Sequence, residues 1–154
     1  MRGVQMSERL TGPAAPVRMM VSRVAHHSYP YKTTDRAQFD RAFDGARAAG
    51  MDDALLLTPG GFVAEAVIWS VLWWEGPQLC GPAFDLGILP GVGRARLTEL
   101  AGKVEERRST LKELQGLPLL LVNAVRGVVP VLSLDGLPLP ESRETEALAA
   151  RFWP

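Results

Sequence analysis

Apolar residues cluster along the chain in short runs that are typical of β-strands. These runs are rich in Val, Leu, Ile and Trp and are bounded by Gly, Pro and polar residues, which predicts buried or half-buried strands. The predicted strands are Val17–Val24, Asp53–Thr58, Phe62–Ala66, Trp69–Trp74, Leu117–Val122 and Val128–Leu134. The Pro-Gly-Gly turn at 59–61 joins the second and third runs, so these two are expected to form a hairpin.

Helical spacing appears between these runs. Asp35–Ala49 carries apolar residues three and four positions apart and is followed by Gly50, a typical helix end. Gly91–Gly102 and Glu141–Phe152 predict two further helices, and Thr110–Leu114 a single turn. The order of elements indicates an α/β domain whose mixed sheet is built partly from hairpins.

Composition and charge narrow the class of protein. The chain has 154 residues, 47% of them hydrophobic, which suits one domain. Seventeen basic residues balance seventeen acidic ones, so the chain has no excess positive charge to attract nucleic acid. No apolar run approaches the roughly 20 residues of a membrane span.

The N-terminal residues suggest how the domain is organised, and the cysteine content suggests the cellular compartment. Met1–Pro16 lacks a signal-peptide core and predicts a disordered leader before a domain at 17–154. Cys80 is the only cysteine, so the chain forms no internal disulfide, and with only His26 and His27 it offers no credible zinc set. These features favour a cytoplasmic protein.

Lys32 is the first candidate for chemistry. The chain has three lysines, and Lys103 and Lys112 lie in charged segments typical of solvated surface. Lys32 instead lies close to Tyr29 and Tyr31, just before a predicted helix. Partial burial there would lower the pKa of the amine and make it nucleophilic, although an ordinary loop lysine also fits.

Three further positions could bind charged groups. The segment Leu89–Arg94, LPGVGR, begins a predicted helix, where free N–H groups favour phosphate, or where glycines serve only turn geometry. Glu65 interrupts an apolar strand, so its carboxylate must either face water or find a cationic partner, for example a protonated ring nitrogen. Arg126 is either an anion binder or a charge at a strand end.

Five segments together resemble a known family. KTTDRAQF, DDALLLTPGGFVAEA, ILPGVGRARLTELA, VEERRSTLKEL and NAVRGVVPV occur in the order and near the spacing of fold-type IV proteins, which depend on pyridoxal phosphate (PLP). This is the class IV aminotransferase family, which includes branched-chain and D-amino-acid aminotransferases and aminodeoxychorismate lyases. The resemblance spans residues 17–138 and implies the mixed-sheet, PLP-binding large domain of the D-amino-acid aminotransferase-like fold.

The resemblance implies roles for the candidates. Lys32 would bind PLP covalently and move a proton between the substrate Cα and the cofactor C4′. Glu65 would keep the pyridine nitrogen protonated.

The resemblance also implies how the cofactor phosphate and the substrate are held. The backbone amides of Val92 and Gly93 would bind the phosphate, with Ala124 at another phosphate contact. Arg36 matches the position after the Asn of the lyases' K-x-x-N motif and is assigned to the cofactor, and Arg126 is assigned to the substrate.

Several positions depart from the family pattern. Asp35 replaces that Asn, Trp69-Ser70 replaces a small residue followed by Asn, and Gly81 stands where Thr is common. Gly93 stands where many members place a Thr whose hydroxyl binds the cofactor phosphate. Loss of that hydrogen bond would cost ~1.5–3 kcal/mol, or roughly tenfold to hundredfold in cofactor affinity.

Family members also carry a smaller domain before this region. The leader is too short to replace it, so the resemblance leaves three expectations: a truncated or mis-started reading frame, a separately encoded N-terminal half, or a degenerate paralogue. The family's active site lies between the two domains near a dimer interface, which implies a homodimer.

The K-T-T start and the NAVRGVVPV segment resemble aminodeoxychorismate lyases more than branched-chain enzymes. The favoured function is therefore the conversion of 4-amino-4-deoxychorismate to 4-aminobenzoate and pyruvate, which serves folate synthesis. The alternatives are an amino-acid transaminase, a non-catalytic remnant of the family, and an unrelated interaction domain. For the last, at least one of Trp69, Trp73 and Trp74 is expected to face solvent or an interface, whereas Trp153 is expected to pack on the last helix.

Overall fold

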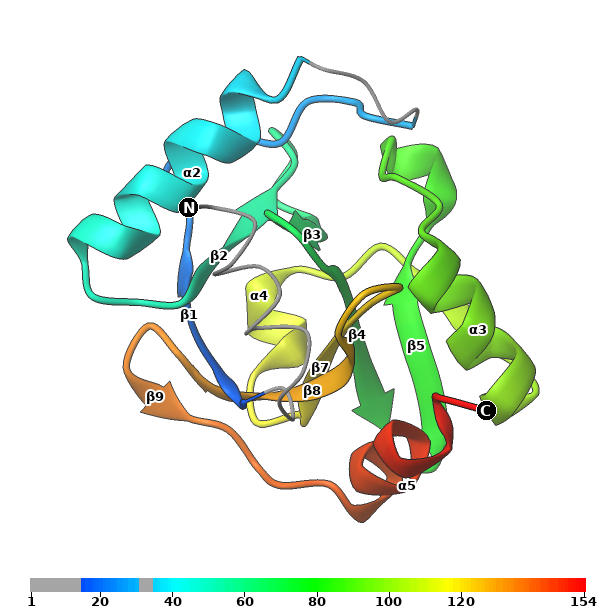
Figure 1. Cartoon of the computed structure of the whole chain (residues 1–154). Helices are drawn as coiled ribbons and strands as arrows, with labels where there is room; N and C mark the ends of the chain where they lie inside the picture. The colour runs from blue at the N-terminus through cyan, green and yellow to red at the C-terminus, as the bar shows by residue number, and fades with distance from the viewer. Residues whose placement is uncertain (1–14, 31–34) are drawn as a thin grey trace, which may run out of the picture.

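The strands form one mixed nine-stranded sheet in the computed structural model, which describes residues 15–30 and 35–154 (Figure 1). Eight strands follow the order β3-β2-β1-β8-β7-β4-β5-β6, and β9 pairs with β8. Their bounds are β1 Val17–Val21, β2 Asp53–Leu57, β3 Val63–Ala66, β4 Ser70–Glu75, β5 Gln78–Pro82, β6 Glu105–Arg107, β7 Leu119–Asn123, β8 Gly127–Leu134 and β9 Leu137–Pro138. β1 is parallel to β2 and β8, and β5 is parallel to β6, whereas the other pairs are antiparallel. The predicted mixed α/β fold is therefore confirmed.

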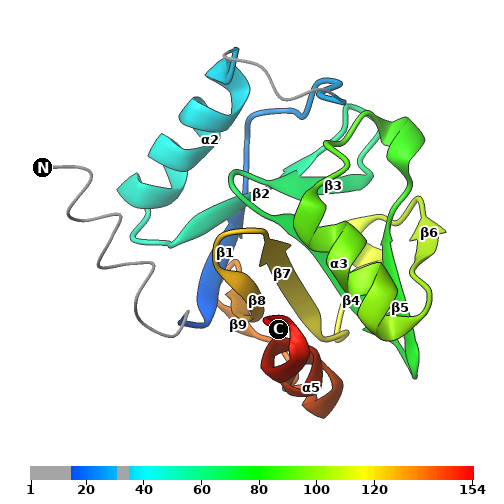
Figure 2. The same cartoon turned by 45° about the vertical axis from the view of Figure 1, so that its right-hand side comes forward.

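The helices pack at separate places along the sheet. They are α2 Ala37–Ala48, the 3-10 helix η1 Phe84–Leu86, α3 Val92–Ala101, α4 Leu111–Leu114 and α5 Arg143–Arg151. α2 contacts β2, while α3 contacts β7 and α5 contacts β8. Figure 2 shows α2 at the β1–β2 end, with α3 and α5 on the remaining part of the sheet.

Strand β7 separates two apolar clusters. Leu119 and Leu121 pack in a cluster with β1, β4 and β8, whereas Leu120 and Val122 pack with α3 and α5. Successive strand residues point to opposite faces, so an uninterrupted apolar run is what a strand buried on both sides requires. A third cluster lies between α2 and β2, around Phe39.

Each predicted strand and helix is present with shifted ends, and three strands were not predicted. The first strand ends at Val21 rather than Val24, and the helix expected at Asp35–Ala49 runs from Ala37 to Ala48. The missed strands are β5, which contains Gly81 and Pro82, the charged β6 and the short β9. Turn-forming residues in β5 and β9, and the absence of apolar residues in β6, conceal them from a periodicity argument.

The expectation for the strand tryptophans was wrong. Trp69, Trp73 and Trp74 are all buried, with 0–8% of each residue exposed. Trp74 Nε1 donates a hydrogen bond to Thr145 Oγ1 at 2.9 Å, which connects β4 to α5. Trp153 contacts the Phe152 ring edge to face but remains 53% exposed, so it covers α5 only in part.

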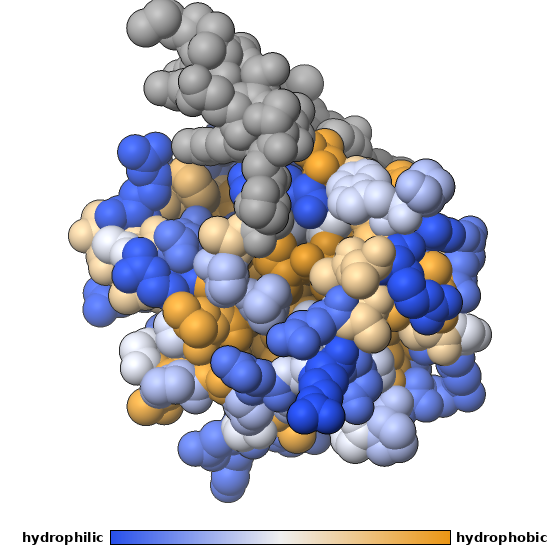
Figure 3. Space-filling model, turned by 60° about the horizontal axis from the view of Figure 1, so that its bottom comes forward, coloured by the Kyte–Doolittle hydropathy of each residue, from blue (hydrophilic) through white to orange (hydrophobic). Residues whose placement is uncertain are grey.

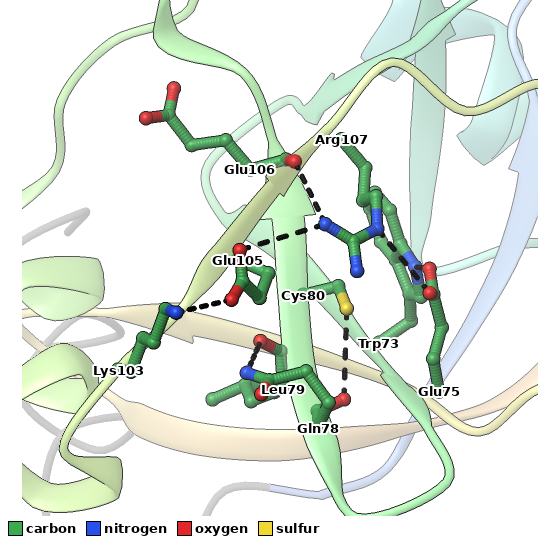
Figure 4. Close-up of polar contacts among 9 residues, drawn as sticks. All are labelled: Trp73, Glu75, Gln78, Leu79, Cys80, Lys103, Glu105, Glu106 and Arg107. Carbon is green, nitrogen blue, oxygen red and sulfur yellow. Dashed lines mark hydrogen bonds and ion pairs between the residues drawn. The ribbon is translucent and has the colours of Figure 1, made fainter.

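Charged side chains line β6, which is one of the two end strands in the sheet order (Figure 4). Glu105 pairs with Lys103 at 2.5 Å and with Arg107 at 3.7 Å, and Arg107 also pairs with Glu75. The hydrogen bond from Trp73 Nε1 lowers the pKa of Glu75. Charges on an exposed strand oppose pairing with another chain, so this edge is protected.

Cys80 lies beneath this charged cluster on β5 (Figure 4). The residue is fully buried, and burial raises the pKa of its thiol to about 11. Its Sγ donates a weak hydrogen bond to the Gln78 carbonyl at 3.7 Å. The thiol is therefore protonated at neutral pH and packs as a small apolar group.

The surface is mostly polar with local apolar patches. Figure 3 shows a face on which apolar residues gather near the middle and polar residues surround them. Leu132 and Leu137, on β8 and β9, are more than half exposed. The longest helix of the described residues, α2, has 12 residues, and none is long and apolar enough to cross a membrane.

Candidate functional site

The predicted site residues come from four parts of the fold. Glu65 lies on β3, and Arg36 lies just before α2. Val92 and Gly93 begin α3, while Ala124 and Arg126 lie in the turn between β7 and β8. Lys32 lies outside the described residues, as do residues 1–14 of the predicted leader.

The N-terminus of α3 presents free backbone donors. Gly91 precedes the helix without a side-chain cap, and the first helical hydrogen bond runs from Ala95 N to Gly91 O. The N–H groups of Val92, Gly93 and Arg94 therefore have no intrahelical acceptor. With no acidic residue in the first turn, this helix end can bind an anion.

Gly93 allows α3 to approach β7 closely. A Cβ atom at Gly93 would lie 2.8 Å from both Cα and the carbonyl carbon of Asn123, closer than such atoms pack. The family's Thr could not occupy this position without moving the helix or the strand. The departure at Gly93 thus has a steric reason, and it places the α3 amides directly beside the turn that contains Ala124.

Arg94 fixes α3 against β5. Its residue is 2% exposed, and its Nη1 donates to the Pro82 carbonyl at 2.7 Å. The guanidinium lies 4.1 Å from the centre of the Phe84 ring, and burial lowers its pKa. A Cβ atom at Gly81 would lie 3.1 Å from Arg94 Cζ. Gly81, where the family commonly has Thr, therefore makes room for this buried cation.

Asn123 shapes the turn between β7 and β8. Its Oδ1 accepts hydrogen bonds from the N–H groups of Val125 and Arg126 at 3.1 and 2.7 Å. Its Nδ2 donates to the Ile68 carbonyl at 3.0 Å. One side chain therefore forms the turn and connects it to the loop between β3 and β4.

That β3–β4 loop, residues 67–69, is held by side chains from two further elements. Arg36 Nη2 donates to the Val67 carbonyl at 2.7 Å, and its guanidinium lies 4.7 Å from the centre of the Phe39 ring. The Val67 N–H donates to Asp53 Oδ1 on β2 at 3.1 Å. Since the loop follows Glu65 directly, these bonds also fix the end of β3.

Asp53 is a buried carboxyl group. It is 1% exposed, its Oδ1 also accepts from the Ala54 N–H at 2.6 Å, and its Oδ2 has no partner among the described residues. Burial raises its pKa to about 6, against the opposing effect of the backbone donors.

Glu65 is buried and paired with a residue that sequence analysis did not select. Its Oε2 lies 2.6 Å from Nε2 of His26, whose side chain is fully buried. Of the two alternatives predicted for this carboxylate, facing water or finding a partner, the structure shows the second, and the partner among the described residues is a histidine. Only the fold could reveal the pair, because 39 residues separate the two positions in the chain.

Arg126 is half-buried in the β7–β8 turn. Its Nε is buried and has no hydrogen-bond partner among the described residues. Its main-chain N–H donates to Asn123 Oδ1 at 2.7 Å. The Nε donor is therefore unused within the described part of the chain, and the substrate role stays a prediction.

Known proteins share both sequence and fold with the chain. The sequence profile of the family described as amino-transferase class IV matches residues 6–134. A protein from Thermotoga maritima, assigned as a branched-chain amino acid aminotransferase, is 28% identical with a TM-score of 0.85, and the match covers 94% of this chain and 57% of that one. A protein from Legionella pneumophila, assigned as a 4-amino-4-deoxychorismate lyase, is 27% identical with a TM-score of 0.83, covering 89% and 55%.

A third solved structure shares the fold and holds a cofactor. It is an aminotransferase from Brucella abortus bound to PLP, 21% identical with a TM-score of 0.83, covering 94% of this chain and 55% of that one. The chain therefore spans little more than half the length of these solved structures. No curated protein matches it significantly. The profile match over most of the sequence, together with the shared fold, shows that the chain belongs to the class IV aminotransferase family.

Proposed function

We propose that this chain is the PLP-binding part of an enzyme that converts 4-amino-4-deoxychorismate to 4-aminobenzoate and pyruvate. The motifs that most resemble the lyases are the K-T-T start at Lys32 and the NAVRGVVPV segment from Asn123. The similarity to the Legionella pneumophila protein, assigned as such a lyase, supports the same activity.

The main structural support for the proposal is the close packing of α3 against the β7–β8 turn. Gly93 contacts the main chain of Asn123 so closely that no side chain fits between them. Asn123 in turn bonds to Ile68, three residues after Glu65. One set of contacts therefore connects the free amides of α3 to the buried carboxylate of Glu65. The amides suit a phosphate group and the carboxylate suits a protonated ring nitrogen, and PLP carries both groups.

Each described residue has a distinct task in this proposal. The N–H groups of Val92 and Gly93 bind the phosphate, and Ala124 adds a main-chain contact in the adjoining turn. Glu65 holds a proton at the pyridine nitrogen. Bound PLP supplies an electron sink that stabilises negative charge at the substrate Cα.

The cationic residues complete the proposed site. Lys32 would hold the cofactor covalently, and once the substrate amine has displaced it, the free lysine amine would move a proton between the substrate Cα and C4′ of the cofactor. Arg36 holds the β3–β4 loop beside the cofactor through the Val67 carbonyl. Arg126 orients a substrate carboxylate with its guanidinium.

Titration of the purified chain with PLP tests the cofactor site. We expect a saturable visible absorbance band, and after borohydride reduction a cofactor adduct that peptide mapping assigns to Lys32. Lys32→Ala should lose the band, whereas Lys112→Ala, which removes an exposed lysine, should retain it. Absence of a saturable band, or equal labelling of all three lysines, would contradict the proposal.

Substrate assays separate the lyase from the second candidate function. An amino-acid transaminase is supported by the similarity to the Thermotoga maritima protein. Pyruvate release from 4-amino-4-deoxychorismate without an amino acceptor indicates the lyase. Amino-group transfer from branched-chain or D-amino acids to a 2-oxo acid indicates the transaminase. PLP binding with neither reaction would favour the non-catalytic remnant.

A further inference from the structure

We propose that His26 is a positioning residue that fixes the Glu65 carboxylate for contact with the cofactor's ring nitrogen. This inference rests on the proposed PLP site and extends it to a residue outside the family motifs. The inference is based on the contact between His26 Nε2 and Glu65 Oε2, which lie 2.6 Å apart. The histidine side chain is fully buried.

The contact divides the two oxygens of the carboxylate between two tasks. A carboxylate only accepts hydrogen bonds, so Nε2–H of His26 donates to Oε2. The contact with His26 does not use Oε1. In the proposed site this second oxygen accepts from a second donor, the N–H of a protonated ring nitrogen.

His26 is itself held rigidly. Its backbone N–H donates to the Leu57 carbonyl on β2 at 2.8 Å, and its ring contacts the edge of Phe39 on α2 at a centroid distance of 6.2 Å. β2 also pairs with the strand of Glu65, through Leu56. The histidine and the carboxylate thus share one scaffold, which restricts the directions that the carboxylate can take.

The other ring nitrogen points to function rather than stability. Nδ1 of His26 is buried and has no hydrogen-bond partner among the described residues. A buried polar atom without a partner is unfavourable for folding. A ring with this unfavourable atom fits a role that lies in its Nε2, which holds Glu65.

PLP titration of matched variants tests this role. His26→Leu removes the donor and should weaken PLP binding by about tenfold or more, the scale seen when a group that orients a ligand is lost. The absorption maximum of the bound cofactor should also shift. His26→Gln keeps an amide donor and should restore most of the affinity, and His27→Leu, at the exposed neighbour, should match the unmodified chain.

Imidazole NMR of the chain without PLP gives a second readout. The chain has two histidines, so His27→Gln assigns their ring signals. We expect His26 to be the Nε2–H tautomer and its Nε2 signal to move in Glu65→Gln. A signal that does not respond to Glu65→Gln would overturn the inference.

The outcomes separate the inference from the proposed function. If His26→Leu binds PLP as tightly as the unmodified chain and with the same absorption maximum, the positioning role is wrong and the PLP site stands. If the unmodified chain shows no saturable PLP binding, the proposed function fails and the role assigned to His26 fails with it.

Discussion

Asp53 carries a buried carboxyl group that accepts hydrogen bonds from the main chain of Ala54 and Val67. Its pKa is raised from 3.8 to about 6, mainly by burial. The folded chain therefore binds more protons than the unfolded chain between these two pH values. The extra bound proton stabilises the folded chain at low pH. This stabilisation, about 3 kcal/mol at most, is lost from the free energy of unfolding as the pH rises through this range.

Asp53→Asn should remove this pH dependence. The amide keeps an oxygen acceptor for the Ala54 and Val67 N–H groups but carries no charge. We expect the variant to gain stability relative to the unmodified chain as pH rises from 4 to 7, measured by urea unfolding. Asp44→Asn, which removes an exposed carboxylate on α2, is the control. A constant difference for Asp53→Asn across this range would contradict the assignment.

Two helical glycines should respond oppositely to the same substitution. Gly93→Ala places a methyl group 2.8 Å from Asn123 Cα and should destabilise the chain by about 1–3 kcal/mol. Gly45→Ala, in an open position on α2, should stabilise it by about 0.5–1 kcal/mol. Thermal or urea unfolding of both variants tests the contact. Equal effects would contradict the close approach of α3 to β7.

The candidate site residues could be selected from the sequence, but the side chains that contact them could not. Motif order placed Glu65, Val92 and Gly93, because these residues lie within segments of characteristic spacing. His26 and Asn123 were not selected, since each acts through a residue far along the chain. An isolated histidine or asparagine has no local pattern that reveals such a contact.

At the scale of elements, the β3–β4 loop depends on Asn123 from β7. Asn123→Asp keeps the Oδ1 acceptor for the Val125 and Arg126 amides but loses the donor to Ile68. Asn123→Ala loses all three bonds, at about 1 kcal/mol each.

Hydrogen exchange distinguishes these two variants. The amides of 67–69 should exchange faster in both, because both release the loop. The amides of Val125 and Arg126 should exchange faster only in Asn123→Ala. Unchanged exchange at 67–69 in Asn123→Asp would show that Asp53 and Arg36 suffice to hold the loop.

Elements with clear periodicity were predicted well, and their pairing was not. β7 was predictable because its apolar run is continuous, as burial on both faces requires. The neighbours of β1, which are β2 and β8, could not be predicted, because β8 lies more than a hundred residues away in the chain. β5 was hidden because it ends in Gly81 and Pro82 and is stabilised by its pairing with β4 and β6.

At the scale of the whole molecule, we propose that the chain forms a homodimer, as the family resemblance implies. Light scattering coupled to size exclusion should then report twice the chain mass of 16.8 kDa. Exposed apolar side chains such as Leu132 and Leu137 are compatible with an interface. A monomer at micromolar concentration would contradict the homodimer and would favour assembly with a separately encoded N-terminal half.

The buried thiol of Cys80 makes the chain convenient for chemical probing. Maleimides and spin labels react with exposed thiolates, and this sulfur is neither exposed nor ionised near neutral pH. The native chain should therefore give almost no background labelling and need no cysteine removal. Asp44→Cys, at an exposed position on α2, could then be tagged selectively, and its distance to a second tag on α3 followed as the cofactor is added.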